Sequence, residues 1–420
     1  MRKRSIFKYK SYSHFDTKKN YKPFINYIKN PKNIEKHGFY PFIHYILRQY
    51  KYDNKTKDSK TKSRDINFSS HIDRYIYEYY NDLLNSKYNN YAIRTGINKC
   101  VVAYRNNLHK NNIFIARDVF NFIRKGTGYY ILVADFTKYF DQICHKYLKS
   151  VLSEVLEYDK LPLDWYKVFR SVTKYSFINL DDIKKYRGLS LKELRKSKRI
   201  ASTNELHELK KYLKINNNGY GIPQGSPISS TLANVNLIHY DKAINDFLTS
   251  KKGFYRRYCD DILLAVPPEY KEELLSLFIN INISIPGLEI NPDKIQDFFY
   301  KNNSIFDNNG NKKKLKYLGF EFDGKYVKVR EKTITSFFLK AYRSLNYVNV
   351  ISARFKRNAY RRKFFNSFTH LGNQKPKRNK GNFLTYIDQC AKIMAENGIK
   401  RQVSRHWDYF SKRLIKYNHK

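Results

Sequence analysis

The spacing of apolar residues along the chain predicts alternating helices and short strands. A helix is expected from Ser69 or Ser70, either of which would cap it, because apolar residues then recur every three or four positions. These residues are Ile72, Tyr75, Ile76, Tyr79, Tyr80, Leu83 and Leu84. Core packing accounts for the aromatic rings of this stripe better than base stacking does, since they share the spacing of one buried face.

Upstream of this helix the pattern is less regular. Residues 1–50 alternate basic and aromatic side chains, and a helix interrupted around Pro41 is predicted near Ile34–Tyr50. The segment Lys51–Arg64 is polar apart from Tyr52, so we expect an exposed loop or linker there.

Several apolar runs predict strands. Tyr129–Ala134 is a continuous apolar run that ends at Asp135. Gly253–Val266 predicts a hairpin, with a short strand on either side of a tight turn at Tyr258–Asp261. A further strand is predicted at Cys100–Arg105. Side chains at the ends of different strands can converge, so Asp135, Asp260 and Asp261 are candidates for one site.

The rest of the chain mixes helices with turns. Further helices are predicted at 116–124, 146–157, 231–247 and 269–280, and a second hairpin around 316–324. Residues 181–218 are polar, with helical segments and no catalytic signature. Helical spacing returns from Arg330 to Lys420, interrupted at Gly372–Gly381.

The charge of the chain is strongly one-sided. Lys and Arg number 81 against 37 Asp and Glu, which gives a formal net charge of +44. From Arg330 to Lys420 there are 22 basic residues against 4 acidic ones. Such an excess predicts a polyanionic partner bound in a salt-dependent manner, and the 16% aromatic content suits stacking on unpaired bases. Nucleic acid is therefore the favoured partner.

Several classes of protein are disfavoured. The four cysteines, Cys100, Cys144, Cys259 and Cys390, are far apart and form no C-x-x-C pair, which argues against a zinc site or a disulfide framework. The basic N-terminus leads into no apolar signal-peptide segment, and no run approaches the ~20 apolar residues of a membrane span. We expect a soluble, cytoplasmic protein without a membrane partner.

Candidate chemistry centres on the adjacent carboxylates of Asp260 and Asp261. Each raises the cost of ionising the other, and a divalent cation such as Mg²⁺ would reverse that cost. An isolated Asp-Asp pair is also common in surface turns. Asp135 supplies a third carboxylate, and two Mg²⁺ ions held ~3.5–4 Å apart would suit in-line phosphoryl displacement. The loop Gly221–Pro227 adds glycines that let the backbone and Gln224 approach a nucleotide closely.

In this order, the segments resemble the palm motifs of reverse transcriptases over about residues 95–325. The matching segments are Asp135–Asp141, Gly221–Pro227, the Tyr-x-Asp-Asp box Tyr258–Asp261, Asn291–Lys294 and Tyr317–Phe320. The resemblance implies an α+β right-hand polymerase fold, in which an antiparallel sheet packed on helices forms the palm. It implies three parts: a helical N-terminal extension at 1–90, fingers and palm at 91–325, and a basic helical thumb at 326–420.

The resemblance also implies roles for single residues. Asp135 and Asp260 would be the principal ligands of two Mg²⁺ ions, Asp261 a supporting carboxylate, and dNTPs the substrates. Phe140 matches a steric gate that leaves no space for a 2′-hydroxyl, although an ordinary core phenylalanine fits the same position. The remaining residues expected at the nucleotide are Phe136, Gln224 and Gly225.

Three basic residues are candidate phosphate contacts. Lys294 would protonate or neutralise the leaving pyrophosphate, or is a solvated turn lysine. Arg105 and Arg117 are candidates for contacts from the fingers to the triphosphate.

The layout resembles the stand-alone reverse transcriptases of bacteria, in particular the unknown-group and abortive-infection relatives that act in antiphage defence. The Tyr-Cys-Asp-Asp box, the length and the N-terminal extension favour this group over retrons. No ribonuclease H-like cluster, protease, integrase or His/Cys-rich endonuclease tail is recognised. The implied partners are an RNA template, expected to be a structured non-coding RNA, and its DNA product. Priming and oligomeric state stay open.

Three other activities also stay open. A template-independent or protein-primed DNA polymerase of the abortive-infection type would have the same palm. A non-catalytic RNA-binding protein with a relict palm is disfavoured by the intact Asp135, Asp260 and Asp261. A group II intron maturase predicts a longer C-terminal DNA-binding region than residues 330–420 offer. Residues 1–90 either bind RNA or brace the fingers.

Overall fold

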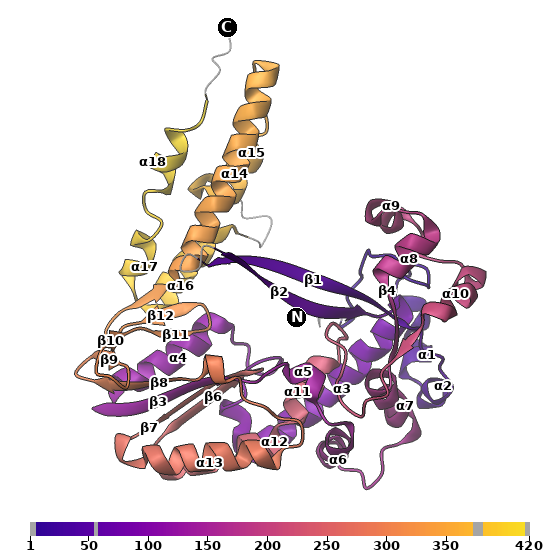
Figure 1. Ribbon diagram of the computed structural model, residues 1–420, viewed down its shortest axis with the longest axis horizontal. Helices are drawn as coiled ribbons and strands as arrows, with labels where there is room; N and C mark the ends of the chain where they lie inside the picture. Colours follow the sequence, from indigo (N-terminus) through magenta and orange to yellow (C-terminus); the bar gives the residue numbers. More distant parts are fainter. Residues whose placement is uncertain (1–5, 54–57, 373–380, 416–420) are drawn as a thin grey trace.

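The computed structural model describes residues 6–53, 58–372 and 381–415. Figure 1 shows a large sheet with its helices at the lower left and a second, mostly helical region at the right. The C-terminal helices rise above the large sheet. A long hairpin, β1 (Phe42–Asp53) and β2 (Asp58–Phe68), runs from the right-hand region toward these helices. The arrangement is the α+β class with antiparallel strands packed on helices that we predicted.

The large sheet has six strands in the order β10-β9-β8-β3-β7-β6, and every neighbouring pair is antiparallel. The structure confirms the predicted strand at 129–134 and the predicted hairpin at 253–266. The strands are β3 (Gly128–Asp135), β6 (Phe254–Tyr258), β7 (Asp261–Val266), β8 (Gln296–Lys301), β9 (Ser304–Phe306) and β10 (Lys312–Lys313).

Both faces of this sheet are buried. Leu132 and Ile262 face one core, whereas their neighbours Ile131 and Leu263 face a second core on the other side. Burial on both faces explains why β3 and β7 are continuous apolar runs rather than alternating ones. Helices of the first core are α3 (His71–Arg94), α11 (Ser229–Val235), α12 (Ile238–Ser250) and α13 (Lys271–Ser284); α4 (Asn112–Lys125) belongs to the second.

The predicted helix after Ser70 is confirmed as α3. The Ser70 hydroxyl caps it by accepting a hydrogen bond from the Asp73 N–H, at 3.3 Å. Tyr75, Ile76 and Tyr80 are buried in the core, as the stripe predicted, whereas Leu83 is 38% exposed.

The other helices surround the two sheets. The helices predicted at 116–124, 146–157 and 269–280 are confirmed, but the one predicted at 231–247 is two helices, broken at Asn236 and Leu237. Because apolar residues continue through the break, the pattern did not reveal it. The remaining helices before residue 330 are α1 (Ile25–Lys29), α2 (Pro31–Glu35), α5 (Tyr139–Gln142), α6 (His145–Leu156), α7 (Leu163–Thr173), α8 (Leu180–Arg187), α9 (Leu191–Lys196) and α10 (Thr203–Leu209), with 3₁₀ turns η1 (Lys22–Phe24), η2 (Ile97–Lys99), η3 (Lys210–Tyr212), η4 (Pro268–Tyr270) and η5 (Pro292–Lys294).

A second sheet corrects two predictions. Its order is β2-β1-β4-β5, with β4 (Ser176–Asn179) and β5 (Lys214–Ile215). The helix predicted near 34–50 is wrong, because α2 ends at Glu35 and β1 begins after Pro41. The loop predicted at 51–64 is wrong where it is described, since residues 51–53 and 58–64 lie in β1 and β2. Its centre, 54–57, lies outside the described residues.

Both errors have one cause. The two strands pair residue by residue from Ile43 with Phe68 to Asp53 with Asp58, so backbone hydrogen bonds between the strands form the hairpin whatever the spacing of apolar residues. Beyond the short segment where β4 pairs with β1, no strand of the sheet borders the hairpin on that side. Such strands need no alternation of apolar and polar residues, and this alternation is the pattern from which a strand is predicted.

The predicted strand at Cys100–Arg105 is also wrong. The segment makes one isolated bridge, Val101 to Arg257, and Tyr104 adopts a left-handed φ of +59°, which ends extended pairing. Two backbone hydrogen bonds hold the segment against β6: the Arg257 N–H donates to the Cys100 carbonyl, and the Val102 N–H donates to the Arg257 carbonyl.

The predicted part boundaries do not coincide with breaks in the fold. Residue 90 lies inside α3, and residues 325 and 326 lie between two paired strands, β12 (Phe320–Phe322) and β13 (Val327–Val329). The strands β1 and β2 share a sheet with β4 and β5, so this part of residues 1–90 belongs to the right-hand region and is not helical.

The C-terminal part consists of a small sheet and helices. β11 (Leu315–Tyr317), β12 and β13 form an antiparallel sheet, which confirms the second hairpin. Most of the interruption predicted at Gly372–Gly381 lies outside the described residues. Within those residues, no helix has the length and apolarity to cross a membrane. The helices are α14 (Glu331–Phe355), α15 (Arg361–Phe368), α16 (Phe383–Met394), α17 (Asn397–Arg401) and α18 (His406–Ser411), with the 3₁₀ turn η6 (His370–Gly372).

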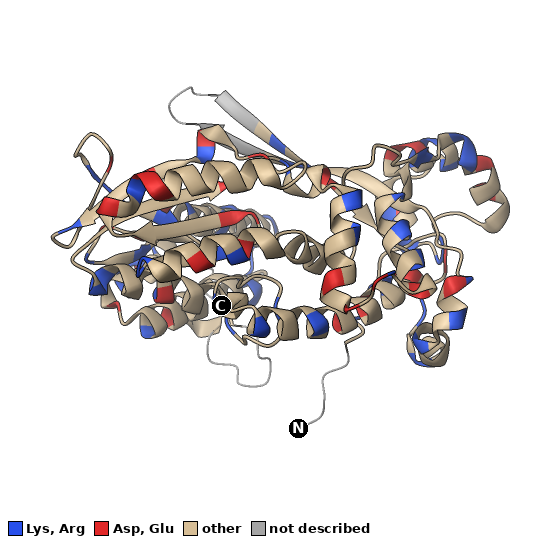
Figure 2. Cartoon of the chain, turned by 90° about the horizontal axis from the view of Figure 1, so that it is seen from below, with Lys and Arg blue, Asp and Glu red and all other residues tan. Residues whose placement is uncertain are grey.

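Charge is unevenly distributed over the molecule. Seen from below, acidic and basic residues mix on the helices that cover the large sheet (Figure 2). On α12, for example, Lys242 pairs with Asp246 at 2.6 Å. Residues 330–420, with 22 basic and 4 acidic residues, contribute 18 of the 44 net positive charges.

Candidate active site

Three carboxylates meet where β3 ends and the β6–β7 hairpin turns. Asp135, the last residue of β3, is the direct cross-strand partner of Asp261, the first residue of β7. Asp261 is also paired with Tyr258, so Cys259 and Asp260 alone form the turn. Directly opposed residues of an antiparallel pair point to the same face. The register of two central strands thus brings together acids that are more than 120 positions apart in the chain.

The turn has a strained residue at its tip. Cys259 adopts a φ of +60°, in the left-handed region that side chains rarely occupy. It is buried, and its thiol is hydrogen-bonded by Tyr104. Burial, together with the charge of Asp260, raises the pKa of the Cys259 thiol to about 12, so the thiol stays protonated.

The carboxylates raise the free energy of each other's ionisation. Partial burial, followed by the charges of Asp260 and Asp135, raises the pKa of Asp261 to about 6. Burial also raises the pKa of Asp135, where Asp260 adds to the effect and Lys294 opposes it. An added positive charge between these groups would therefore be strongly favoured.

Lys294 already supplies one such charge. Its ammonium forms an ion pair with the Asp135 carboxylate. Lys294 ends the turn η5, and Asn291, just before this turn, donates its N–H to the Asp135 carbonyl at 2.9 Å. The other oxygen of Asp135, Oδ1, is buried without a hydrogen-bond partner. Within the described residues, no three His, Cys, Asp or Glu side chains are already gathered as a metal site. The unsatisfied oxygen and the two neighbouring acids nevertheless fit a divalent cation, which prefers carboxylate oxygens.

A buried ion pair supports the turn from below. Arg257 and Asp241 are both fully buried and pair through two hydrogen bonds, from Nε to Oδ1 at 2.7 Å and from the guanidinium to Oδ2 at 2.6 Å. Tyr255 donates to the same carboxylate. The remaining Arg257 nitrogen donates to the carbonyl of Cys259 at 2.8 Å. Arg257 thereby links the backbone of the turn to the core of the sheet.

The loop Gly221–Pro227 lies against α5, directly after β3. Its Ile222 N–H donates to the Phe140 carbonyl at 2.9 Å, and Gln224 hydrogen-bonds the carboxyl of Asp141. The Gln224 carbonyl accepts from the Asn67 N–H at the end of β2. The structure thus places Gln224 between α5 and the β1–β2 hairpin.

Gly225 has a requirement inside the protein, and its predicted contact with a nucleotide stays a prediction. The predicted reason for this glycine was close approach of a nucleotide, but a Cβ here would lie 2.5 Å from the Asn67 carbonyl oxygen, and φ is +120°. Contact with β2 and the backbone conformation are therefore sufficient to require glycine at this position.

The two phenylalanines after Asp135 have different surroundings. Phe140 is half-buried and has its ring edge-on to Tyr139, with centroids 5.9 Å apart. Phe136 is only 2% exposed and packs on Tyr139 and Tyr240. The Phe136 side chain thus belongs to the core, and any nucleotide contact is left to its main chain.

Arg105 requires a correction. Its guanidinium donates to the side chains of Asn89 and Asn98 and to the carbonyls of Asn98 and Val101, and it lies over the Tyr88 ring. These partners commit Arg105 to holding the segment after η2. The predicted contact with a triphosphate is therefore not supported.

Arg117 lies on α4 apart from the loop residues. It pairs with Asp118 at 3.1 Å and lies over the ring of Phe114. No contact between Arg117 and the three central carboxylates is present, so a nucleotide role for it stays a prediction.

Sequence reasoning missed the residues that support the site. Tyr104 is 47% exposed, and its ring centroid is 6.5 Å from that of Tyr258. The charge of Arg330, before α14, opposes the rise in the pKa of Asp261 that burial and the neighbouring acids cause, and its N–H donates to the Gly319 carbonyl. For Arg257 a signal exists: strand alternation places it on the buried side with Tyr255, where an arginine needs an acidic partner. Nothing local indicated Tyr104 or Arg330.

Comparison with known proteins agrees with the motifs. Residues 55–322 match the reverse transcriptase (RNA-dependent DNA polymerase) family. The chain belongs to the reverse transcriptase family. The matched residues include all five motifs, from Asp135 to Phe320, and the family generally uses divalent metals and dNTPs. A comparison with curated protein sequences gave no match.

Similar solved structures include yeast telomerases. Apo telomerase from Candida tropicalis is 10% identical, with 90% of this chain and 59% of that chain covered and a TM-score of 0.45. Telomerase from Candida albicans in complex with a TWJ fragment of telomeric RNA is 13% identical, with coverage of 93% and 59% and a TM-score of 0.42. This reverse transcriptase-family chain thus spans a little over half the length of those telomerase chains.

Proposed function

We propose that the protein is an RNA-directed DNA polymerase, which joins dNTPs to the 3′ end of a primer paired with an RNA template. The observation that carries this proposal is the register of β3 and β7, which opposes Asp135 to Asp261 beside Asp260. In the proposed reaction, the primer 3′-oxygen attacks the α-phosphorus of the dNTP. A new P–O bond forms as the bond to pyrophosphate breaks.

The residues around the carboxylates have distinct proposed roles. Asp135 and Asp260, supported by Asp261, would hold two Mg²⁺ ions, which neutralise charge on the attacking and leaving oxygens when bound. Lys294, beside Asp135, would neutralise or protonate the leaving pyrophosphate. The other proposed contacts are Gln224 with the nucleotide and Phe140 with the sugar.

One face of α14 supports a nucleic-acid partner. Leu339, Tyr347 and Val350 are 51%, 57% and 64% exposed, and with Arg343 and Arg354 they recur at helical spacing on one side. Exposed apolar and basic side chains in one stripe suit the sugar-phosphate surface of a duplex. We therefore propose that α14 contacts the primer–template.

We further propose a biological setting for this activity. The Tyr-Cys-Asp-Asp box supports, by resemblance, a place among bacterial stand-alone enzymes of the unknown-group and abortive-infection type. In that setting the enzyme works in the cytoplasm, copies a structured non-coding RNA into cDNA and takes part in antiphage defence.

Primer extension tests the activity. We expect Mg²⁺-dependent incorporation of dNTPs on an RNA template, and its loss in the double variant Asp260→Ala, Asp261→Ala. The matched control is Asp181→Ala with Asp182→Ala, which removes another adjacent acidic pair, on α8, and leaves the three central carboxylates in place.

The outcomes separate the competing functions. Full extension by the Asp260 and Asp261 double variant would refute the proposed site. Homopolymer products made without template would instead identify a template-independent polymerase. Failure of the wild-type protein to extend any primer, with RNA still bound, would favour a non-catalytic RNA-binding protein.

A further inference from the structure

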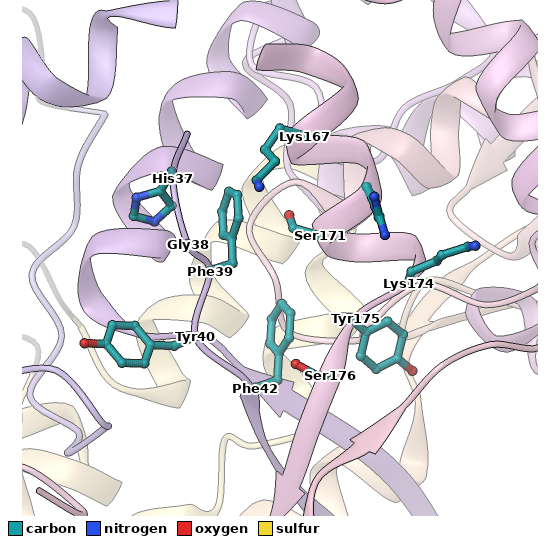
Figure 3. Close-up of a pocket in the computed structure, with 11 residues that line it drawn as sticks. His37, Gly38, Phe39, Tyr40, Phe42, Lys167, Ser171, Lys174, Tyr175 and Ser176 are labelled. Atoms are coloured by element: carbon teal, nitrogen blue, oxygen red, sulfur yellow. The ribbon is translucent and has the colours of Figure 1, made fainter. Parts of the chain in front are cut away.

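A pocket of about 330 Å³ lies outside the proposed active site. One side is formed by residues 37–42, between α2 and the start of β1, and the other by α7 and the residues that follow it (Figure 3). No Asp or Glu lines this pocket. Its lining is instead basic and aromatic, a combination suited to nucleic acid.

The basic side chains come from α7 and its C-terminal end. Lys167 and Arg170 are three residues apart on one side of the helix, and Lys174, the residue that follows the helix, also lines the pocket. Lys167 reaches toward the ring of Phe39 in Figure 3. Among the described residues, no carboxylate lies within ion-pair distance of any of the three. Unpaired positive charges without a local acid favour an anionic ligand.

Two half-buried rings add a stacking surface. Phe39 is stacked on Tyr77, with ring centroids 5.3 Å apart, and Tyr175 meets Phe42 edge-on at 5.8 Å. These contacts hold both rings in place before any ligand binds. His37 is committed elsewhere, because it bonds Asp73 at 2.8 Å and Tyr27 at 2.9 Å. The phosphate-binding groups are therefore the α7 residues.

The pocket is connected to the Gly221–Pro227 loop. The side-chain amide of Asn216 donates to the Thr173 carbonyl at the end of α7 and to the Tyr220 carbonyl beside the loop, at 3.0 and 2.8 Å. Its backbone N–H donates to the Tyr175 carbonyl at 2.9 Å. In addition, burial and then the charge of Asp141 raise the pKa of the Tyr175 phenol, and Gln224 hydrogen-bonds the carboxyl of Asp141. A nucleic-acid strand held in this pocket would thus lie close to the Gly221–Pro227 loop.

We propose that this pocket binds an unpaired stretch of RNA, with phosphates on Lys167, Arg170 and Lys174 and a base against Phe39 or Tyr175. The inference rests on the proposed function in one respect, that the strand belongs to the template. Its effect is to anchor the single strand beyond the duplex that the palm and α14 would hold.

Binding measurements with a labelled primer–template test the proposal. Two substrates are compared by fluorescence anisotropy, one blunt and one with an unpaired RNA overhang of about ten nucleotides, within the usual reach of a single-strand site. The variant is Lys167→Gln, Arg170→Gln, Lys174→Gln. The matched control, Lys301→Gln, Lys312→Gln, Lys314→Gln, removes three exposed lysines from the β8–β10 edge of the large sheet.

We expect the overhang to tighten binding of the wild-type and control proteins by about tenfold and to have no effect on the α7 variant. The slope of log K against log salt for the overhang substrate should fall by about 2 in the α7 variant, since each single-strand phosphate contact contributes about 0.7. Equal overhang dependence in the wild-type and α7 variant proteins would overturn the proposal. Equal loss for blunt and overhang substrates would also overturn it.

Photocrosslinking supplies a second, independent readout. An overhang that carries 4-thiouridine should crosslink to peptides containing Phe39 or Tyr175, and crosslinks confined to other peptides would overturn the proposal. Neither measurement requires polymerisation. If the wild-type protein binds the overhang in this way but extends no primer, the proposed function fails while the RNA-binding pocket stands.

Discussion

The buried side chain of Arg257 holds the backbone of Cys259, at the tip of the active-site turn. Arg257 pairs with Asp241 inside the core and donates to the Cys259 carbonyl, and both charged side chains are completely buried. Removing one partner of such a pair leaves an uncompensated charge, whereas replacing both by apolar residues costs far less. Stability and positioning of the turn can therefore be separated by mutation.

We predict that Asp241→Ala lowers the free energy of unfolding by roughly 3–5 kcal/mol. The double variant Asp241→Leu, Arg257→Met should recover most of that loss, because no buried charge remains. It should nevertheless extend primers poorly, since the Cys259 carbonyl has lost its donor. Urea denaturation and primer extension measure the two effects, and wild-type extension by the double variant would contradict a positioning role for Arg257.

Phe140 is the second residue with a separable role. We predict that Phe140→Ala relaxes discrimination against rNTPs, because removal of the ring leaves space for a 2′-hydroxyl, whereas Phe140→Tyr keeps the ring and the discrimination. The measurement is the ratio of kcat/KM for a dNTP and the matching rNTP. An unchanged ratio in Phe140→Ala would place the sugar gate elsewhere.

At the scale of elements, the large sheet and α14 present complementary groups. The sheet presents the carboxylates at the ends of its central strands, and α14 presents an exposed apolar and basic face. The hairpin β1–β2 connects the second sheet to the loop through Asn67 and Gln224. A change in one element should therefore affect binding or chemistry without unfolding the others.

For α14 we predict an electrostatic effect on duplex binding. Arg343→Gln with Arg354→Gln should reduce the salt slope for a blunt primer–template by about 2, since each duplex phosphate contact contributes about 0.9. Lys184→Gln with Lys185→Gln on α8 serves as the control and should leave the slope unchanged. An unaltered slope in the α14 variant would argue that this helix does not contact the backbone.

The whole molecule is defined by its net charge of +44. A protein this basic attracts nucleic acid of any sequence at low salt, so specific binding has to be measured at physiological salt or above. We predict that protein isolated from its host at physiological salt carries one predominant RNA, together with complementary DNA. Sequencing of the co-purified nucleic acid is the measurement, and a random mixture of host RNAs would contradict a dedicated template.

The sequence by itself determined the family of the protein and the order of its motifs. Asp135 at the end of an apolar run, the Asp260–Asp261 turn and the ordered motifs between them were visible because buried central strands and tight turns have strong local signatures. The basic C-terminal part was equally visible, since charge is a sum over residues. These features were sufficient to predict the family and its α+β fold.

Only the tertiary structure decided which residues support that chemistry. The contact of Gly225 with Asn67 and the pocket between residues 37–42 and α7 depend on partners far away in the chain. The hairpin β1–β2 and the contacts of Arg105 inside the protein involve closer partners, but the spacing of apolar residues contains no information on backbone pairing or on polar side-chain contacts. The sequence indicated Asp135, Asp260 and Asp261 as candidates, but the register of β3 and β7 is what places Asp135 opposite Asp261.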